Sequence, residues 1–132
     1  MRQKKLLLAV PFVLALIIGS TGSRAQEGVK RTDLQTHDLS IPGREVVQQM
    51  VELQPGVVVG KHTHPGEEVS VVLEGELRLE VAGKPAVTLK AGEVLFVPAG
   101  TVHAAKNVGN VTASELATYI VEKGNPLVVL GK

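Results

Sequence analysis

Two histidines and a glutamate that lie close together in the sequence could bind a metal ion. His62 and His64 are separated by one residue, and side chains of a β-strand alternate between its faces, so both imidazoles would point to the same side. Pro65-Gly66 follows and is typical of a turn, which would bring Glu68 back towards the histidines. Imidazole and carboxylate ligands suit divalent iron, manganese, nickel or zinc. We therefore predict that this stretch forms most of a site for one divalent metal ion.

The elements that must position these residues are short strands. Residues 44–123 consist of strand-forming runs separated by Gly and Pro turn signals, and residues 76–81 alternate charged and apolar side chains. Residues 111–121 contain alanine and glutamate, which a helix would allow, but their threonine, tyrosine, isoleucine and valine favour a strand. This pattern predicts an all-β sandwich or barrel. The expected strands are 44–53, 57–64, 68–73, 76–81, 86–89, 93–97, 102–106 and 111–121.

The first 25 residues have the pattern of a secretory signal peptide. Residues 1–5 include one arginine and two lysines, residues 6–18 are apolar, and Ser23-Arg24-Ala25 offers small side chains to a signal peptidase. We expect cleavage after Ala25, so that the mature chain begins at Gln26. The alternative is an uncleaved membrane anchor, but a spanning helix normally needs about 18 or more apolar residues. The sequence thus predicts a periplasmic or secreted protein.

Charge and cysteine content argue against nucleic acid as a partner and against a lipid anchor. The whole chain has 14 basic and 13 acidic residues. The predicted signal peptide holds four of the basic residues and none of the acidic ones, so the mature chain would carry a net charge of −3. No basic stripe with interleaved aromatics remains, which argues against nucleic acid as a partner. The absence of cysteine excludes disulfides and a thiol-linked lipid, so we expect no stable membrane anchor after cleavage.

The spacings of ten residues resemble the two signature motifs of the cupin superfamily. The first motif comprises Gly56, His62, His64, Glu68 and Gly75, and the second comprises Gly92, Pro98, Gly100, His103 and Asn107. The resemblance covers residues 44–121 and extends to small single-domain cupins, many of them periplasmic. It implies an antiparallel jelly-roll β-barrel of six to eight strands.

The same resemblance supplies a fourth metal ligand. It implies that His103 joins the other two histidines and Glu68 around one divalent metal ion inside the barrel. The residues themselves agree, because His103 is the one further histidine of the strand-rich region. We expect its strand to pair beside the strand of Glu68. Pro98 and the motif glycines are interpreted as turn residues, and Asn107 as a residue that hydrogen-bonds its own turn.

The expected layout has four segments. They are a signal peptide at 1–25, an N-terminal arm at 26–43, a cupin β-barrel at 44–123 and a C-terminal tail at 124–132. The arm is polar and has one short strand at most. His37 lies in this arm, far in sequence from the other histidines and without a ligand-like neighbour. We interpret it as a surface histidine.

Two classes of function fit a metal-binding cupin fold, which does not by itself choose a reaction. The residues expected to share the ligands' faces are small or aliphatic: Val58, Gly60, Ser70, Val72, Leu77, Leu79, Val81 and Ala105. No second cluster of acid and base residues stands near the site in sequence, and Glu67 should face away, which disfavours isomerases and epimerases. One hypothesis is a small dioxygenase-type metalloenzyme. The alternative is a non-catalytic metal- or small-ligand-binding cupin of the cell envelope.

Apolar residues on both faces of the histidine strand predict a second subunit. By alternation, Val57 and Val59 would lie on the face opposite His62. Val69, Val71 and Leu73 of the next strand would lie near them. Apolar side chains left in water would cost about 1.5–3 kcal/mol each relative to burial. We therefore predict a homodimer, in which the arm at 26–43 could add a strand to the partner.

Overall fold

The computed structural model of the protein describes residues 26–131, and every regular element among them is a β-strand. The predicted signal peptide at 1–25 lies outside the described residues. Within them, no helix is long and apolar enough to cross a membrane. The ten strands are β1 (Val29–Asp38), β2 (Arg44–Leu53), β3 (Val58–Thr63), β4 (Gly66–Glu74), β5 (Glu76–Val81), β6 (Val87–Lys90), β7 (Val94–Val97), β8 (His103–Asn107), β9 (Ala113–Glu122) and β10 (Val129–Leu130).

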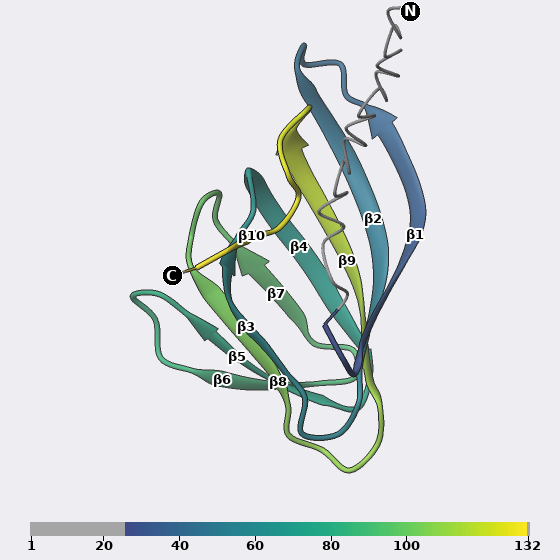
Figure 1. Ribbon diagram of the computed structural model, residues 1–132, viewed down its shortest axis with the longest axis vertical. Coiled ribbons are helices and arrows are strands. Elements are labelled where there is room, and N and C mark those ends of the chain that lie inside the picture. The colour runs from purple at the N-terminus through teal and green to yellow at the C-terminus, as the bar shows by residue number, and fades with distance from the viewer. Residues whose placement is uncertain (1–25, 132) are drawn as a thin grey trace, which may run out of the picture.

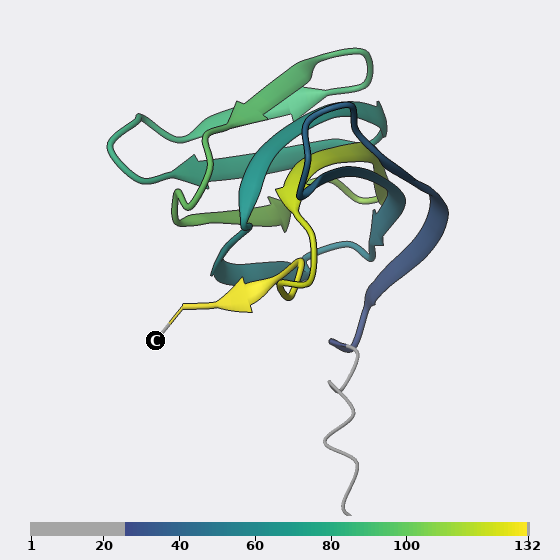
Figure 2. The ribbon, with the colours of Figure 1, turned by 90° about the horizontal axis from the view of Figure 1, so that it is seen from above.

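These strands form two five-stranded sheets whose paired strands are all antiparallel (Figures 1 and 2). One sheet has the order β1-β2-β9-β4-β7, and the other has the order β10-β3-β8-β5-β6. The all-β antiparallel prediction is confirmed. The predicted jelly-roll barrel is not closed, because within residues 26–131 no strand of one sheet pairs with a strand of the other. Side chains packed between the sheets, rather than a continuous ladder, close the interior.

Two glycines let the chain pass from one sheet to the other. Gly66 opens β4 after the histidine strand, and a Cβ at this position would collide with the backbone of Ile120 on β9. Gly75 separates β4 from β5 and has a φ of 75°, which is the left-handed region that favours glycine. A side chain at either corner would push the chain away from β9, the neighbour of β4 in the same sheet. These corners place Glu68 on the sheet that faces the histidines.

Alternating burial along the strands builds the core between the sheets. In β5, Leu77, Leu79 and Val81 are buried while Arg78 and Glu80 are exposed, as the sequence predicts. Each buried side chain of this kind contributes about 1.5–3 kcal/mol relative to exposure. In β9 the inward positions 113–121 alternate in the same way, which confirms the strand prediction for this stretch.

The face assignment predicted for the histidine strand is wrong, because β3 contains a β-bulge. Val59 pairs with Ala105 and His62 with His103, so β3 uses three steps where β8 uses two. The extra residue reverses the alternation. Val59 is therefore 5% exposed and faces the interior with His62, whereas Val58 is 43% exposed. Gly60 is exposed as well and does not share the ligands' face.

Two strand neighbourhoods also differ from expectation. The sequence predicts that β8, the strand of His103, pairs with β4, the strand of Glu68. β8 pairs with β3 and β5 instead, so it faces β4 across the interior. The region expected to be an arm forms the ten-residue strand β1, which pairs with β2 of its own chain. The tail contributes β10, which pairs with β3. As predicted, Asn107 forms a hydrogen bond within its own turn, where its Oδ1 accepts from the N–H of Gly109.

Candidate metal centre

Three imidazoles converge in the interior between the sheets. His62 lies on β3, His64 directly follows that strand, and His103 opens β8. A ring nitrogen of each lies within 4.8 Å of those of the other two, and each side chain is buried. The prediction that His62 and His64 point to the same side is confirmed.

Hydrogen bonds to backbone carbonyls fix the tautomer of all three rings. The Nδ1–O distances are 2.8 Å from His62 to Gly60, 2.6 Å from His64 to Leu127 and 2.9 Å from His103 to Thr101. A carbonyl oxygen can only accept, so each neutral ring carries its proton on Nδ1. The lone pair on each Nε2 is then free. Metal-binding histidines have this arrangement, in which one nitrogen is held by a neighbour and the other faces the ion.

Glu68 completes the cluster from the opposite sheet. Its Oε2 lies 3.1 Å from His64 Nε2 and 3.3 Å from His103 Nε2. Its Oε1 accepts a hydrogen bond of 2.8 Å from the hydroxyl of Ser70, two residues further along β4. Among the described residues, the buried Nε2 of His64 has no hydrogen-bond partner. A carboxylate oxygen and an unprotonated nitrogen repel at this distance unless a proton or a cation lies between them, so these donors fit a metal ion.

The electrostatics of the cluster keep most of its donors deprotonated. Burial lowers the pKa of His62 to about 4, with a smaller contribution from the other two imidazoles. Burial would raise the pKa of Glu68, but the adjacent imidazoles of His103 and His64, which attract the carboxylate when either is protonated, and the Ser70 hydroxyl outweigh it and hold this pKa below its ordinary value. Burial would lower the pKa of His103, but the Glu68 carboxylate and the Thr101 carbonyl raise it. The pair formed by Glu68 and His103 therefore attracts one positive charge, which a metal ion can provide in place of a proton.

A small cavity adjoins the cluster. Its volume is about 20 Å³, which is room for about one water molecule. Most of its wall is apolar, and the lining residues are Arg31, Val51, Leu53, Val59, His62, Glu68, Leu77, Leu79, Leu95, His103, Ala105, Glu115 and Tyr119. Of the wall residues predicted from the sequence, Leu77, Leu79 and Ala105 line it. The β-bulge in β3 puts Val59 there instead of Val58 and Gly60.

The fold brings a further titratable group to the site, although no second cluster of acid and base residues stands near it in sequence. Glu115 on β9 lines the same cavity and is 8% exposed. Burial, followed by the nearby Glu68 carboxylate, raises its pKa to about 8. Tyr119 lines the cavity too, and its pKa is raised by burial and then by the same carboxylate. The signal in the sequence was a glutamate at an inward position of a strand whose other inward residues are alanine, tyrosine and valine.

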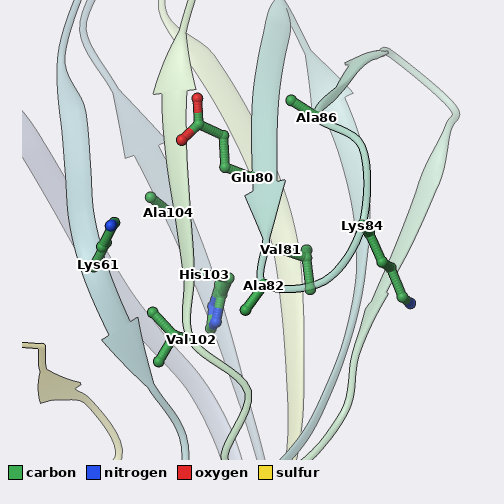
Figure 3. Close-up of a pocket in the computed structure, with 9 residues that line it drawn as sticks. All are labelled: Lys61, Glu80, Val81, Ala82, Lys84, Ala86, Val102, His103 and Ala104. Atoms are coloured by element: carbon green, nitrogen blue, oxygen red, sulfur yellow. The ribbon is translucent and has the colours of Figure 1, made fainter.

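A groove on the outer side of the β3-β8-β5 sheet lies against His103. It has a volume of about 340 Å³, and its lining includes His103, Val102 and Ala82 (Figure 3). Its charged side chains are Lys61, Glu80 and Lys84. In Figure 3, Glu80 lies at the end away from His103 and Lys84 points away from the ring. These charged groups do not converge on one point. The buried cluster between the sheets, and not this groove, is therefore the candidate site.

The structure thus brings together the four residues that the sequence singled out as ligands. His37 is exposed on β1, where its ring lies 3.2 Å from the side-chain oxygen of Gln35, in line with a surface histidine. Arg31, Glu115, Tyr119 and the carbonyl of Leu127 are the additions that sequence reasoning missed. Arg31 is exposed, yet its side chain reaches the cavity wall from β1.

Comparisons with known proteins point in the same direction as this geometry. The family described as "Cupin domain" matches residues 49–119. The oxalate-binding protein of Thermotoga maritima is 40% identical over 72 residues, which is 54% of this chain and 59% of that protein. The Oryzines biosynthesis cluster protein J of Aspergillus oryzae is 32% identical over 130 residues, covering 95% of this chain and 71% of that protein.

A solved structure of recombinant oxalate oxidase in complex with glycolate is similar in fold. The TM-score is 0.64 at 25% sequence identity, and the match covers 83% of this chain and 58% of that chain. The chain therefore spans less than two thirds of the oxalate-binding protein and of this oxidase.

Proposed function

The chain belongs to the cupin family, and we propose that it binds one divalent metal ion through His62, His64, His103 and Glu68. The observation that carries the proposal is the set of three Nδ1 hydrogen bonds to backbone carbonyls, which leave three Nε2 lone pairs free. Two of these nitrogens, on His64 and His103, lie 3.1 and 3.3 Å from Glu68 Oε2. Nitrogen and oxygen donors of this kind suit iron, manganese, nickel or zinc. When bound, such an ion supplies a Lewis-acid centre with open coordination positions.

We further propose that the ligand is a small carboxylic acid such as oxalate. The cavity beside the cluster is mostly apolar and has room for about one water molecule. Its walls must therefore move apart to admit any larger ligand, which favours a molecule of few atoms. With its raised pKa, Glu115 is mainly protonated at neutral pH and can donate a hydrogen bond to a ligand oxygen. Arg31 adds a positive charge at the wall. The likeness to an oxalate-binding protein and to an oxalate oxidase supports the same chemical class.

Two functions remain for such a protein, and Glu115 favours the enzyme. Binding alone needs the metal and a fitting cavity. A dioxygenase-type reaction also needs open metal positions, of which four protein ligands leave up to two on a six-coordinate ion, and a group that holds or releases a proton. Glu115 is such a group, since a pKa of about 8 lies near the working range of most enzymes.

Native purification followed by elemental analysis and oxygen-uptake assays tests these proposals. We expect about one iron or manganese ion per chain, with oxygen consumption that depends on oxalate or glycolate. Tightly bound zinc with ligand binding but no turnover would leave the binding function and reject the enzyme. A purified protein without divalent metal that also fails to take up any of the four metals would reject both.

We propose export as well, from the composition of residues 1–25. Protein recovered from the cell envelope or the medium should begin at Gln26, which mass spectrometry of the intact chain determines. A chain that retains Met1 and sediments with the membranes would contradict this proposal.

We also propose a homodimer, formed through the outer face of β4 and β7. Val69, Leu73, Val94 and Phe96 are 43%, 46%, 69% and 53% exposed on this face. A contiguous apolar patch is uncommon on a monomer. Val69→Lys should shift the protein towards monomer in light scattering, whereas wild type should have a dimer mass at micromolar concentration. A wild-type monomer mass would reject the proposal. Val59, which the sequence assigned to the exposed face, lies in the core and takes no part in this surface.

A further inference from the structure

The C-terminal segment, residues 124–131, lies along β3, the strand that carries His62 and leads directly into His64 (Figures 1 and 2). In β10, Val129 pairs with Thr63 and Leu130 pairs with His62. The N–H of Gly131 donates a hydrogen bond of 2.7 Å to the carbonyl of Lys61. The segment thus contacts three consecutive residues of the histidine strand through its backbone.

The same segment provides the hydrogen-bond acceptor for the third ligand. The carbonyl of Leu127 accepts from Nδ1 of His64 at 2.6 Å, across 63 positions of sequence. The other two histidines use the carbonyl two residues before them, on the same piece of chain. His64 is therefore the one imidazole of the cluster whose Nδ1 acceptor comes from a distant segment.

Backbone contacts, more than buried side chains, hold the segment in place. Val129 and Leu130 are 49% and 72% exposed. Leu127 is partly buried and packs against the larger core cluster. A short strand with exposed side chains separates from its sheet at a lower free-energy cost than a core strand does. The hydrogen bond to His64 thus depends on a weakly held element.

We propose that the C-terminal segment is a positioning element of the metal site, in which the Leu127 carbonyl holds His64 in its metal-binding tautomer. This inference rests on the proposed metal function. If the segment detaches, Nδ1 of His64 loses its acceptor. The tautomer with the ring proton on Nε2 then becomes the more stable one, because that N–H can donate a hydrogen bond to Glu68 Oε2, 3.1 Å away. A proton between His64 Nε2 and Glu68 Oε2 engages the lone pairs of both atoms, which the metal ion needs as ligands.

The coupling must act in both directions. If docking of the segment raises the metal affinity by some factor, metal binding raises the docking equilibrium by the same factor. The metal-free protein should therefore release residues 124–131 more often than the metal-loaded protein does. The fraction of protein with a docked C-terminal segment should therefore rise with the metal content.

A truncated chain that ends at Asn125 tests the proposal. Zn²⁺ affinity is measured by competition with a chelating indicator, and far-UV circular dichroism checks the fold. We expect the truncated chain to bind Zn²⁺ about 10–100-fold more weakly, the usual cost of losing a partner that orients a metal ligand. Leu130→Ala is the matched control and should bind like wild type, because its exposed side chain is not used. A truncated chain that is folded and binds within threefold of wild type would overturn the proposal.

A second variant keeps the test decisive if truncation unfolds the protein. Gly131→Pro in the full chain removes the N–H that donates to Lys61 and leaves Leu127 unchanged. We expect a loss of several-fold in Zn²⁺ affinity and faster proteolysis of the C-terminal segment. Unchanged values of both would contradict the coupling.

A measurement without metal separates this inference from the proposed function. In metal-free wild-type protein, the Nδ1–H of His64 should give a slowly exchanging NMR signal, which Gly131→Pro should weaken and truncation should abolish. If no variant binds Zn²⁺ but this signal behaves as described, the metal function fails and the positioning of His64 stands. If wild type lacks the signal, the positioning role fails whatever the metal affinity is.

Discussion

The two buried carboxyl groups of the cavity lie in opposite environments. Glu68 and Glu115 stand on neighbouring strands of the same sheet, and both are nearly inaccessible. Glu68 accepts a hydrogen bond from Ser70 and faces two imidazoles. Within residues 26–131, Glu115 makes neither a hydrogen bond nor an ion pair. Burial alone would raise both pKa values, and the partners of Glu68 reverse its shift.

This difference assigns different roles to the same chemical group. An ionised carboxylate can bind a metal ion, whereas a protonated carboxyl can donate a hydrogen bond or a proton. Pairs of titratable groups whose environments drive their pKa values apart are typical of sites where acid and base chemistry occur together. The two carboxyl ends of the cavity, one proposed to bind a metal ion and the other a ligand, are thus distinguished by their hydrogen-bond partners and not by residue type.

The largest expected effect comes from removing a partner of Glu68. His103→Ala deletes one proposed ligand and one contact to Glu68 Oε2, so we expect metal affinity to fall on the order of 100-fold or more. Elemental analysis after dialysis against a metal buffer measures this loss. His37→Ala is the control and should retain the metal of wild type. Equal metal contents in the two variants would contradict the ligand assignment.

The second effect tests the protonated state of Glu115. Its pKa is near 4.5 in the unfolded chain and about 8 in the folded protein. The folded state binds this proton more tightly, so the associated stability is fully present below about pH 4.5 and is lost as the pH rises through about 8. In metal-free protein, Glu115→Gln should therefore be more stable relative to wild type at pH 9 than at pH 5, by on the order of 2 kcal/mol or more.

Urea unfolding at the two pH values measures this difference. Glu80→Gln is the matched control, because Glu80 is exposed on β5 and should change stability alike at both values. If Glu115→Gln also gives the same difference at pH 5 and pH 9, the two carboxyl groups do not differ as described.

A smaller effect should follow from the hydroxyl that supports Glu68. Ser70→Ala removes the 2.8 Å hydrogen bond to Oε1 and leaves the four proposed ligands in place. We expect metal affinity to fall about tenfold, the lower end of the range for a group that orients a ligand. Ser70→Thr, which retains a hydroxyl, should recover part of the loss. Indicator competition with Zn²⁺ measures both, and an affinity unchanged in Ser70→Ala would show that Glu68 is oriented without Ser70.

The smallest expected effect concerns Tyr119. Its ring centroid lies 4.7 Å from that of His64, so Tyr119→Phe keeps this packing and removes the hydroxyl only. We expect metal affinity within threefold of wild type and an unfolding free energy changed by about 1 kcal/mol or less. Tyr119→Ala, which also removes the ring, should cost about 3–5 kcal/mol in thermal or urea unfolding. Similar losses in both variants would mean that the hydroxyl, rather than the ring, supports the histidine.

The sequence by itself determined the features that depend on local periodicity. Alternation along 76–81 and the turn signals between the runs predicted the strands, because side-chain direction and turn conformation are set within a few residues. His62 and His64 share a face for the same reason. The motif spacing also identified His103 as the third histidine of the cluster.

Only the tertiary structure decided what depends on pairing between distant segments. The bulge in β3 arises from its register with β8, and it exchanged the faces assigned to Val58 and Val59. Glu115 becomes a cavity residue because β9 lies between β2 and β4, and Leu127 reaches His64 because β10 joins the edge of β3. The sequence contains these residues, but their partners are chosen by the packing of two sheets, where burial and hydrogen bonding between remote strands set both position and charge.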